Sequence, residues 1–398
     1  MVLGFLLARA GIDVVVLEKH KDFLRDFRGD TIHPSTLELM YELGILHEFL
    51  QCPHEKLTTI SAQVGGRTVV LGEFTHLPTH CKFLVLMPQW DFLNFLVEQA
   101  RQYPTFHLIM QAEATGLIEE NDAVVGLRAQ TTEGEMEIRA SLTVGADGRH
   151  SIIRQRAGLQ VRDLGAPMDI VWMRLSRREG DPAQAFGHAE PGKMLVLINR
   201  NSYWQAAVVI PKGAAEEVKQ RGLSSFQSEI AAMEPFLRGR VEELRDWSQV
   251  SLLTVKVDRL VQWSRPGLLC IGDAAHAMSP IGGVGINLAI QDAVAAANIL
   301  SPRLRAGIPS PDDLRAVQKR RNFPTAATQW LQLTIQDRII RRVLGRTAPL
   351  GFPWLLKLMQ WFPYLRRFPG RLVGVGFRPE HVAESLAKSP RSEGRRAA

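Results

Sequence analysis

The 398-residue sequence predicts a three-layer, Rossmann-like α/β domain with an inserted mixed β-sheet and a helical C-terminal region. Two glycine-rich turns that join apolar strands to helices, at residues 145–154 and 268–287, predict the α/β domain. Alternating strand patterns between residues 168 and 257 predict the second sheet. With 45% hydrophobic and 22% charged residues, the composition is that of a globular chain and excludes a disordered or fibrous protein.

The N-terminus predicts the second half of a β-α-β unit. It reads as the end of a helix, a stop at Gly11, and a buried strand over residues 12–17 that closes in Glu18. In such a unit a GxGxxG turn binds a pyrophosphate, and an acid at this strand end binds the ribose. The glycine turn is absent, so we expect a unit that lacks about 15–20 residues. Either the start codon is misassigned, or the chain is a truncated relative. The apolar opening lacks the basic stretch and cleavage site of a signal peptide.

The net charge of +7 is unevenly distributed. Residues 301–398 carry 19 Lys and Arg against 6 Asp and Glu, so the basic character belongs to this region and does not indicate nucleic-acid binding. Three scattered cysteines exclude a disulfide framework and a CxxC metal or redox site, and they fit a cytoplasmic protein. The apolar stretch at 284–300 is interrupted by polar residues and is not expected to span a membrane.

Periodicity predicts the remaining elements in order. We expect helices over 34–50, 89–102 and near 214–232, a hairpin of strands 57–64 and 67–71 around Gly65 and Gly66, and further strands at 106–119, 123–131, 135–144, 170–176, 194–199, 203–210 and 251–257. The expected first domain comprises residues 1–56, 89–166 and 258–300, and the second comprises 57–88 and 167–257. Residues 301–398 are expected to be helical, broken at Pro349, Pro353, Pro363 and Pro369, with the last ten or so residues disordered.

The most specific motif is LLCIGDAAH at residues 268–276, followed by PIGGVGIN at 280–287. It predicts a buried strand that ends in an acid, a glycine-rich turn and a long helix. Asp273 at the strand end can accept hydrogen bonds from a polyol such as a ribityl chain. Small residues at 282–285 let backbone N–H groups at the helix start approach a flat, electron-rich ring. The alternative, a loop that serves only strand–helix packing, explains less of this constrained string.

The second motif is GADGRHSIIR at residues 145–154. It follows a strand pattern and opens a helix, so Asp147 and Ser151 are expected to cap that helix. An Asp-Gly turn that caps a helix is ordinary by itself, but its combination with the first motif is not.

The two motifs, together with Glu18, resemble those of FAD-dependent aromatic-ring monooxygenases of the para-hydroxybenzoate hydroxylase type. The resemblance covers roughly residues 1–300, and it extends to hydroxylases of phenols, polyketides and ubiquinone precursors. It implies FAD as cofactor, NAD(P)H and O2 as co-substrates, and hydroxylation of a small apolar, aromatic or quinone-like molecule through a flavin C4a-hydroperoxide. The hard chemistry then belongs to the cofactor, and neither a catalytic side chain nor a metal is expected.

The resemblance also implies which residues bind FAD. They are Glu18 at the adenosine ribose with Lys19 beside it, Arg28 near the pyrophosphate, Gln89 at the side of the flavin, Asp147 in a motif for FAD and NAD(P)H, Asp273 at the ribityl and pyrophosphate groups, Pro280 and Gly283 in the glycine turn, and Gly285, Ile286 and Asn287 as backbone donors toward the isoalloxazine. His276 and His33 are interpreted as structural. Trp172, Trp204, Trp247 and Trp263 are expected mostly in the core, with one or two at the substrate pocket.

Two other functions stay open at this point. The chain could be a truncated, non-catalytic flavoprotein relative, or a flavin reductase or halogenase-like enzyme on the same scaffold. The WxWxIP string typical of halogenases is absent from the sequence.

The C-terminal region combines basic and aromatic residues. Between residues 341 and 378, eight Lys and Arg are interleaved with Trp354, Trp361, Phe362, Tyr364 and several leucines. Such short amphipathic pieces either pack on the FAD domain or make peripheral contact with an anionic membrane.

Overall fold

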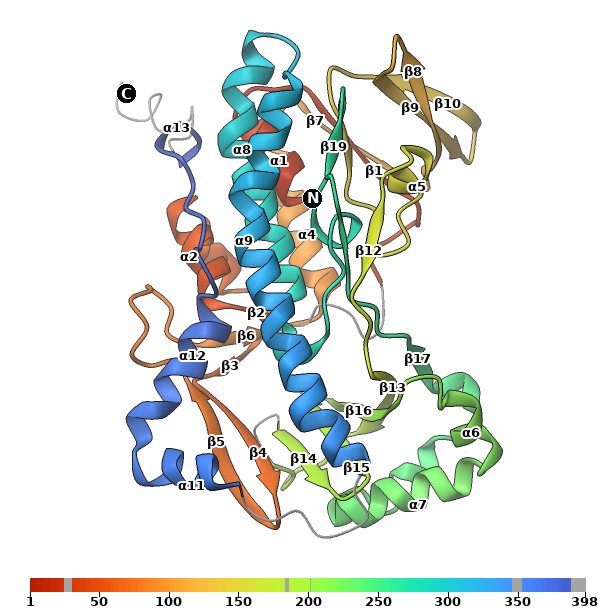
Figure 1. Cartoon of the computed structure of the whole chain (residues 1–398), viewed down its shortest axis with the longest axis vertical. Coiled ribbons are helices and arrows are strands. Elements are labelled where there is room, and N and C mark those ends of the chain that lie inside the picture. The colour runs from red at the N-terminus through yellow and green to blue at the C-terminus, as the bar shows by residue number, and fades with distance from the viewer. Residues whose placement is uncertain (25–30, 183–185, 201, 346–352, 388–398) are drawn as a thin grey trace.

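The computed structural model describes residues 1–24, 31–182, 186–200, 202–345 and 353–387. Two long helices, α8 (Gly285–Ala306) and α9 (Pro311–Ile335), lie side by side along the longest dimension of the molecule (Figure 1). The α/β part surrounds one end of this pair, and a large antiparallel sheet lies at the other end. The N-terminus of α8, which follows the glycine turn, therefore points toward the large sheet.

Two pairs of parallel strands form the centre of the α/β part. β1 (Val14–Glu18) pairs with β7 (Phe106–Met110), and β11 (Thr143–Gly145) pairs with β20 (Leu268–Cys270), which β19 (Ser264–Arg265) extends as an antiparallel strand. Within the described residues, no strand pairs with the second edge of β1. Val15 is 43% exposed, so the expectation of a buried strand here is wrong. Successive side chains of a strand alternate in direction, and only the side that bears Val16 packs on the preceding helix.

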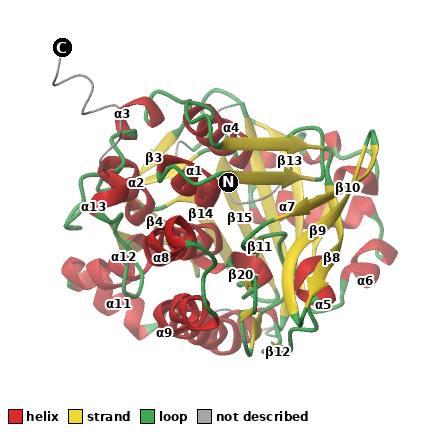
Figure 2. Cartoon of the chain, turned by 90° about the horizontal axis from the view of Figure 1, so that it is seen from above, coloured by secondary structure: helices red, strands yellow, loops and turns green. Residues whose placement is uncertain are grey.

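Short helices flank these strands and build the main hydrophobic core with α8. They are α1 (Val2–Arg9), α2 (Pro34–Glu42), α3 (Leu46–Phe49), α4 (Gln89–Ala100) and α5 (Ile152–Arg156). Figure 2 shows α8 end-on between α1 and α9. As predicted, α1 ends before Gly11. The helix expected over 34–50 is divided into α2 and α3 by an interruption after Leu43. α4 confirms the helix predicted to begin at Gln89.

A three-stranded antiparallel meander covers one side of the α/β part. It consists of β8 (Glu113–Glu120), β9 (Ala123–Thr131) and β10 (Gly134–Arg139). The single strand expected over 106–119 is wrong, because it is divided into β7 and β8, which belong to different sheets. Gln111 between them has φ 55°, and this left-handed backbone conformation redirects the chain.

The large sheet has seven strands in the order β17-β13-β16-β15-β14-β4-β5. Their bounds are β17 (Ser251–Leu253), β13 (Met168–Ser176), β16 (Tyr203–Pro211), β15 (Lys193–Asn199), β14 (Phe186–Glu190), β4 (Thr59–Val64) and β5 (Arg67–Glu73). The predicted hairpin around Gly65 and Gly66 is confirmed as β4 and β5. One face packs on α6 (Ala215–Gln220), α7 (Leu223–Met233) and the short turns η1 (Pro235–Leu237), η2 (Val241–Glu243) and η3 (Trp247–Gln249). The other face packs on Ile281 and Ile340.

Two small sheets connect these parts. β2 (Thr31–Ile32), β6 (Leu84–Leu86) and β3 (Glu55–Leu57) form one, and β12 (Val161–Asp163) with β18 (Asp258–Leu260) forms the other. Residues 84–86, which sequence analysis assigned to the second domain, pair with β2 and β3 instead of the large sheet. The strand expected over 251–257 ends at Leu253.

The C-terminal region is helical, as predicted. After α9 come the π-turn η6 (Gln336–Ile340), α10 (Arg341–Leu344), α11 (Trp354–Trp361), η7 (Pro363–Arg366), α12 (Arg367–Gly374) and α13 (Glu384–Ala387). Pro353 and Pro363 mark helix starts, whereas the break expected at Pro369 is wrong. Pro369 lies in the first turn of α12, where the missing N–H is tolerated. Pro349 and the last residues, expected to be disordered, lie outside the described residues.

One helix is long and apolar enough to cross a membrane by length and composition. It spans Ile281–Ala306, so it includes η5 (Ile281–Gly283) and α8, a region that sequence analysis did not expect to span a membrane. Of its apolar window, 61% is buried inside the protein, which is typical of a core helix.

Candidate functional site

Both predicted motifs lie at the carboxyl ends of paired parallel strands, β11 and β20. β20 leads into the short turn η4 (Gly272–Ala274), which carries Asp273. The Asp273 side chain is 30% exposed and forms an ion pair with Arg149 of the second motif at 3.6 Å. In open α/β sheets, ligands bind outside this edge of the strands. Asp273 is thus a solvent-accessible acid at the edge where a cofactor is expected.

The second motif caps its helix as predicted. Ser151 accepts a hydrogen bond from the backbone N–H of Arg154 at 2.9 Å, and Asp147 accepts from the N–H of Ile153 at 3.1 Å and from the Ser151 hydroxyl at 2.5 Å. These bonds satisfy N–H groups that a helix start leaves unpaired. The motif therefore fixes the loop that brings Arg149 to Asp273.

The first motif forms a tight glycine turn ahead of α8. The turn begins after Pro280, and Gly282 and Gly283 adopt φ 75° and 62°. A Cβ at Gly283 would also lie 3.0 Å from Oγ1 of Thr31, so a side chain at this position is disfavoured by space and by backbone conformation. The predicted backbone donors Gly285, Ile286 and Asn287 form the first turn of the helix, where N–H groups lack partners within the helix.

The side chain of Asn287 has a structural role that the sequence did not indicate. Its Oδ1 accepts from the His33 N–H at 3.0 Å and from the Thr36 hydroxyl at 2.8 Å, and its Nδ2 donates to the carbonyl of Thr31 at 3.0 Å. The side chain thereby holds the start of α8 against β2 and α2. Because the side chain is occupied in this way, the predicted role as a donor to the cofactor rests on the backbone N–H of Asn287, which lies in the first turn of α8.

His33 is part of the same junction. It is 1% exposed, and its Nδ1 lies 2.6 Å from the carbonyl of Val373, so Nδ1 carries the proton. Burial lowers the pKa of His33 to about 4, which keeps the imidazole neutral. The interpretation of His33 as a structural residue of this loop agrees with these contacts.

His276 is buried and paired with an acid. Its Nε2 lies 2.5 Å from Oδ2 of Asp292 on α8, and its ring lies 5.0 Å from that of Trp263. Asp292 also accepts from the N–H of Gly272 at 3.0 Å and from Nε of Arg321 at 2.9 Å. These contacts agree with a structural role for His276.

Asp292 is a residue that the motif reasoning missed. Burial alone would raise its pKa, but the charges and hydrogen bonds of His276 and Arg321 outweigh burial and lower it. Arg321 in turn donates to Glu380 at 3.1 Å. The signal that could have found Asp292 is an acid inside an otherwise apolar helix pattern, because a buried carboxylate needs partners.

The other predicted ligands lie at neighbouring element ends. Glu18 ends β1, and its Oε1 accepts from the N–H of His20 at 3.0 Å, while Lys19 pairs with Glu113 at 3.6 Å. Gln89 is the half-buried first residue of α4, and Met87 and Pro88 separate it from the end of β6. Arg28 lies outside the described residues. Of the four tryptophans expected in the core, Trp172, Trp204 and Trp263 are buried, and Trp247 is half-buried.

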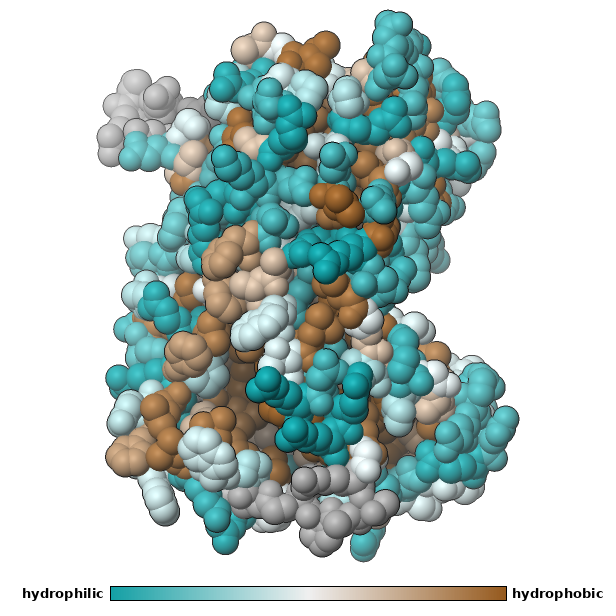
Figure 3. Space-filling model, in the orientation of Figure 1, coloured by the Kyte–Doolittle hydropathy of each residue, from teal (hydrophilic) through white to brown (hydrophobic). Residues whose placement is uncertain are grey.

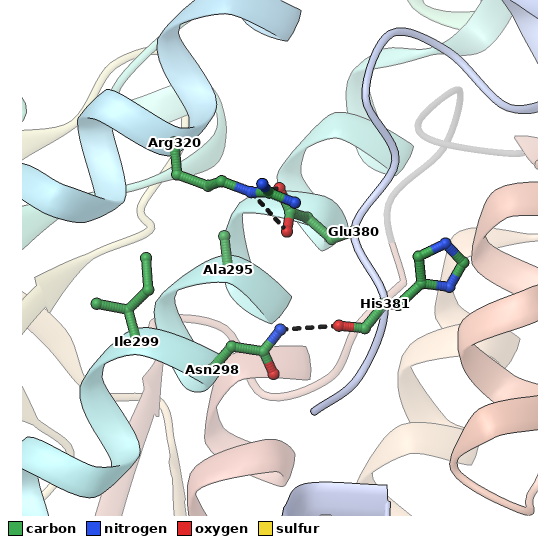
Figure 4. A pocket seen from close by; sticks show the side chains of 6 residues that line it. All are labelled: Ala295, Asn298, Ile299, Arg320, Glu380 and His381. Atoms are coloured by element: carbon green, nitrogen blue, oxygen red, sulfur yellow. Dashed lines mark hydrogen bonds and ion pairs between the residues drawn. The ribbon is translucent and has the colours of Figure 1, made fainter. Parts of the chain in front are cut away.

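Two cavities lie close to these elements. The larger, about 370 Å³, lies between α8, α9 and the segment before α13, and Figure 4 shows its lining residues. Their polar groups are paired with each other, Arg320 with Glu380 at 2.8 Å and Asn298 with the carbonyl of His381 at 2.8 Å. The smaller, about 90 Å³, borders the glycine turn at Ile281 and Gly282. The larger cavity contains none of the predicted ligands.

The residues of the glycine turn fit an FAD cofactor. Gly283 leaves little room for a side chain, the start of α8 presents backbone N–H groups, and Asp273 is partly exposed at the neighbouring strand end. A flat ring at the turn and a polyol at the acid match this donor and acceptor set.

Comparisons with known proteins agree with this fit. A family described as "FAD binding domain" matches residues 1–330. The 6-methylpretetramide 4-monooxygenase of Streptomyces rimosus is 31% identical over 368 residues, which are 92% of this chain and 87% of that protein. The 3-demethoxyubiquinol 3-hydroxylase of Escherichia coli (strain K12) is 24% identical over 313 residues, 74% of this chain and 75% of that protein.

Among solved structures, the anhydrotetracycline hydroxylase OxyS of Streptomyces rimosus superposes with a TM-score of 0.74 at 21% identity, over 96% of this chain and 75% of that one. This likeness shows the fold. Together, the matched family and the relative at 31% identity show that the chain belongs to the FAD-binding monooxygenase family.

Proposed function

We propose that this FAD-dependent monooxygenase hydroxylates an aromatic or quinone-like molecule that binds between the glycine turn and the apolar face of the seven-stranded sheet. The observation that carries the proposal is the packing of Ile281, in that turn, against the sheet face that bears Trp172, Val196 and Val209. An apolar ring suits such a surface, since ligand sites are mostly apolar with a few polar groups. The relative at 31% identity is named for 6-methylpretetramide, which supports a substrate of that kind.

For the cofactor, we propose the ligands expected from the sequence. Asp273 would accept hydrogen bonds from the ribityl or pyrophosphate region, and the N–H groups of Gly285, Ile286 and Asn287 would donate to the ring. Glu18, Lys19, Gln89, Asp147, Pro280, Gly283 and Arg28 are proposed to line the rest of the FAD site. When bound, FAD supplies the electron transfer from NAD(P)H and the activation of O2.

The chain itself contributes position and electrostatics. The start of α8 carries the positive end of the helix dipole, which favours negative charge on a group placed there. The apolar sheet face excludes water from that side of the glycine turn. We propose no side chain as a catalytic acid, base or nucleophile.

The test measures whether an oxygen atom from O2 is incorporated into the product. Purified protein is incubated with FAD, NAD(P)H, isotopically labelled O2 and an aromatic polyketide-type phenol, and the product is analysed by mass spectrometry. We expect one labelled oxygen atom in the product. NAD(P)H oxidation without incorporation would instead support a flavin reductase, and purification without bound or bindable FAD would support a non-catalytic relative. Halogenation of the phenol in a parallel reaction that also contains chloride would support a halogenase-like enzyme.

We also propose a cytoplasmic protein that makes peripheral contact with a membrane. The excess of Lys and Arg in residues 301–398 supports this part of the proposal.

A further inference from the structure

Six large apolar side chains gather on the outer side of α11, η7 and α12. They are between 43% and 76% exposed, and we call them the C-terminal aromatic surface: Trp354, Leu355, Trp361, Phe362, Tyr364 and Phe368. Trp354 and Trp361 are two helical turns apart, so they lie on the same side of α11. Monomeric proteins rarely expose so many large apolar groups within 15 residues, and such clusters mark interaction sites.

The inner side of the same helices is packed on the protein. Met359 of α11 is buried, and α12 lies against β5 so closely that a Cβ on Gly370 would stand 2.0 Å from the carbonyl oxygen of Glu73. Arg366 donates from Nε to the carbonyl of Met359 at 3.0 Å and ties η7 to α11. The helices that carry the C-terminal aromatic surface are therefore fixed to the protein through their inner side. The exposed aromatic side chains lie on the opposite side and take no part in this packing.

The electrostatic setting is strongly basic. The sequence contains no Asp or Glu between Arg338 and Pro379. Lys357, Arg367 and Arg371 are exposed, and none of them forms an ion pair with another residue in the part of the chain that the structure describes. A basic charge next to exposed aromatic rings complements a surface that is anionic and has an apolar layer beneath.

We propose that the C-terminal aromatic surface docks on an anionic phospholipid bilayer. Trp354, Trp361 and Tyr364 would enter the headgroup region, where amphipathic rings are favoured, while Lys357, Arg367 and Arg371 meet the lipid phosphates. The inference gives residues and a partner to the proposed peripheral contact, and it does not depend on the identity of the hydroxylated substrate. A second copy of the chain would bury the aromatic rings equally well, but it would bring the same basic residues together.

The docking surface is connected to the candidate active site. Figure 3 shows hydrophobic residues around a hollow on the face where α9, α11 and α12 lie. Leu372 and Val373 of α12 line the cavity of about 90 Å³ together with Ile281 and Gly282 of the glycine turn. A bilayer at the C-terminal aromatic surface would therefore lie close to α12, which borders the cavity at the glycine turn. This proximity favours a lipophilic substrate.

The experiment is vesicle flotation of the full-length protein at low and high salt. The vesicles are phosphatidylcholine alone or an equal mixture of phosphatidylcholine and phosphatidylglycerol. The test variants are Trp354→Ser with Trp361→Ser, and Arg367→Glu with Arg371→Glu. The matched controls are Trp330→Ser, an exposed tryptophan on α9, and Lys82→Glu with Arg101→Glu, two exposed basic residues on the α/β part.

We expect wild type and both controls to float with the anionic vesicles at low salt and much less at high salt, because salt screens exposed charges. Each test variant should bind about tenfold or more weakly. No flotation of wild type on anionic vesicles, or equal loss in a control, would overturn the proposal. Self-association that sedimentation detects in wild type and that the tryptophan variant abolishes, without lipid binding, would assign the surface to a second copy. FAD content, measured on the same samples by absorbance, keeps these outcomes separate from a failure of the proposed hydroxylase function.

Discussion

Asp292 of helix α8 accepts a hydrogen bond from Nε2 of His276 at 2.5 Å, and both side chains are almost fully buried. The same carboxylate accepts from the N–H of Gly272, directly before Asp273. One buried acid thus joins the turn at the end of β20 to the helix that starts at the glycine turn. Arg321 of α9 neutralises this acid and pairs with Glu380, so the C-terminal segment is tied to the same network.

The first prediction is that Asp292→Asn lowers the free energy of unfolding by about 3–5 kcal/mol. The amide keeps the volume of the side chain but removes the buried carboxylate that faces both His276 and Arg321, so that Glu380 is the remaining acid beside the Arg321 guanidinium. Urea denaturation followed by circular dichroism measures the change. Asp312→Asn is the control, because Asp312 is exposed and its pair with Arg315 should contribute little. Equal stability of the two variants would contradict the importance of the buried network.

The second prediction concerns acid pH and His33. The pKa of His33 is about 4 in the folded protein and 6.5 in the unfolded chain. Between these values the unfolded chain binds a proton that the folded chain does not, so stability falls as the pH falls from 6.5 to 4, by up to about 3 kcal/mol. Below the lower value this loss is complete, and above pH 6.5 it is absent.

His33→Gln should remove this part of the pH dependence, since a glutamine amide can still donate to the carbonyl of Val373. The measurement is the free energy of unfolding at pH 7.0 and pH 5.0, which lie about half a unit above and about one and a half units below the pKa of histidine in the unfolded chain. The exposed His47, changed to Gln, is the control. A wild-type slope that His33→Gln leaves unchanged would show that another group is responsible.

The local sequence predicted more of the candidate FAD site than of the buried contacts that hold its elements in place. The capping of α5 by Asp147 and Ser151 spans only eight residues, so residue type and spacing were enough to predict it. The same holds for the glycine turn, where positive φ angles follow from the run of glycines. In contrast, Asp292, Arg321 and Glu380 meet only because two helices and the C-terminal segment pack together. No periodicity encodes such a contact.

The errors in the predicted fold have related causes. Periodicity alone could not separate β7 from β8, because both segments have strand patterns and the division depends on the backbone of one residue, Gln111. The exposure of Val15 depends on which elements cover β1, which is a tertiary property. Pro369 was read as a helix break, although a proline in a first turn is compatible with a helix.

The third prediction is that Gly283→Ala destabilises the protein by about 1–2 kcal/mol, because an L-residue is strained at φ 62° and its Cβ would crowd Thr31. Thermal unfolding of the protein without added FAD measures this effect. Gly285→Ala is the matched control, since its Cβ would meet only Met278 at an ordinary 3.6 Å. We expect a change within about 0.5 kcal/mol for the control. Similar losses in both variants would mean that the turn tolerates a side chain at neither position and that the φ of Gly283 is not the reason.

The last prediction tests the proposed FAD ligand Asp273 against its neighbour in the other motif. Asp273→Ala removes a partly exposed carboxylate that forms an ion pair with Arg149 at 3.6 Å. Ion pairs of solvent-accessible groups contribute about 1 kcal/mol or less, so we expect little loss of stability. A hydrogen bond to a charged group contributes about 1.5–3 kcal/mol, so FAD affinity should fall about tenfold to a hundredfold, and the variant should lose its yellow flavin absorbance on desalting. Asp147→Ala removes one of the two caps of α5 and the acceptor of the Ser151 hydroxyl, so it should lower the thermal stability as well as FAD binding. Fluorescence titration with FAD and thermal unfolding, with Asp312→Ala as the exposed control, separate the two effects. Stoichiometric FAD in purified Asp273→Ala would exclude Asp273 as a ligand.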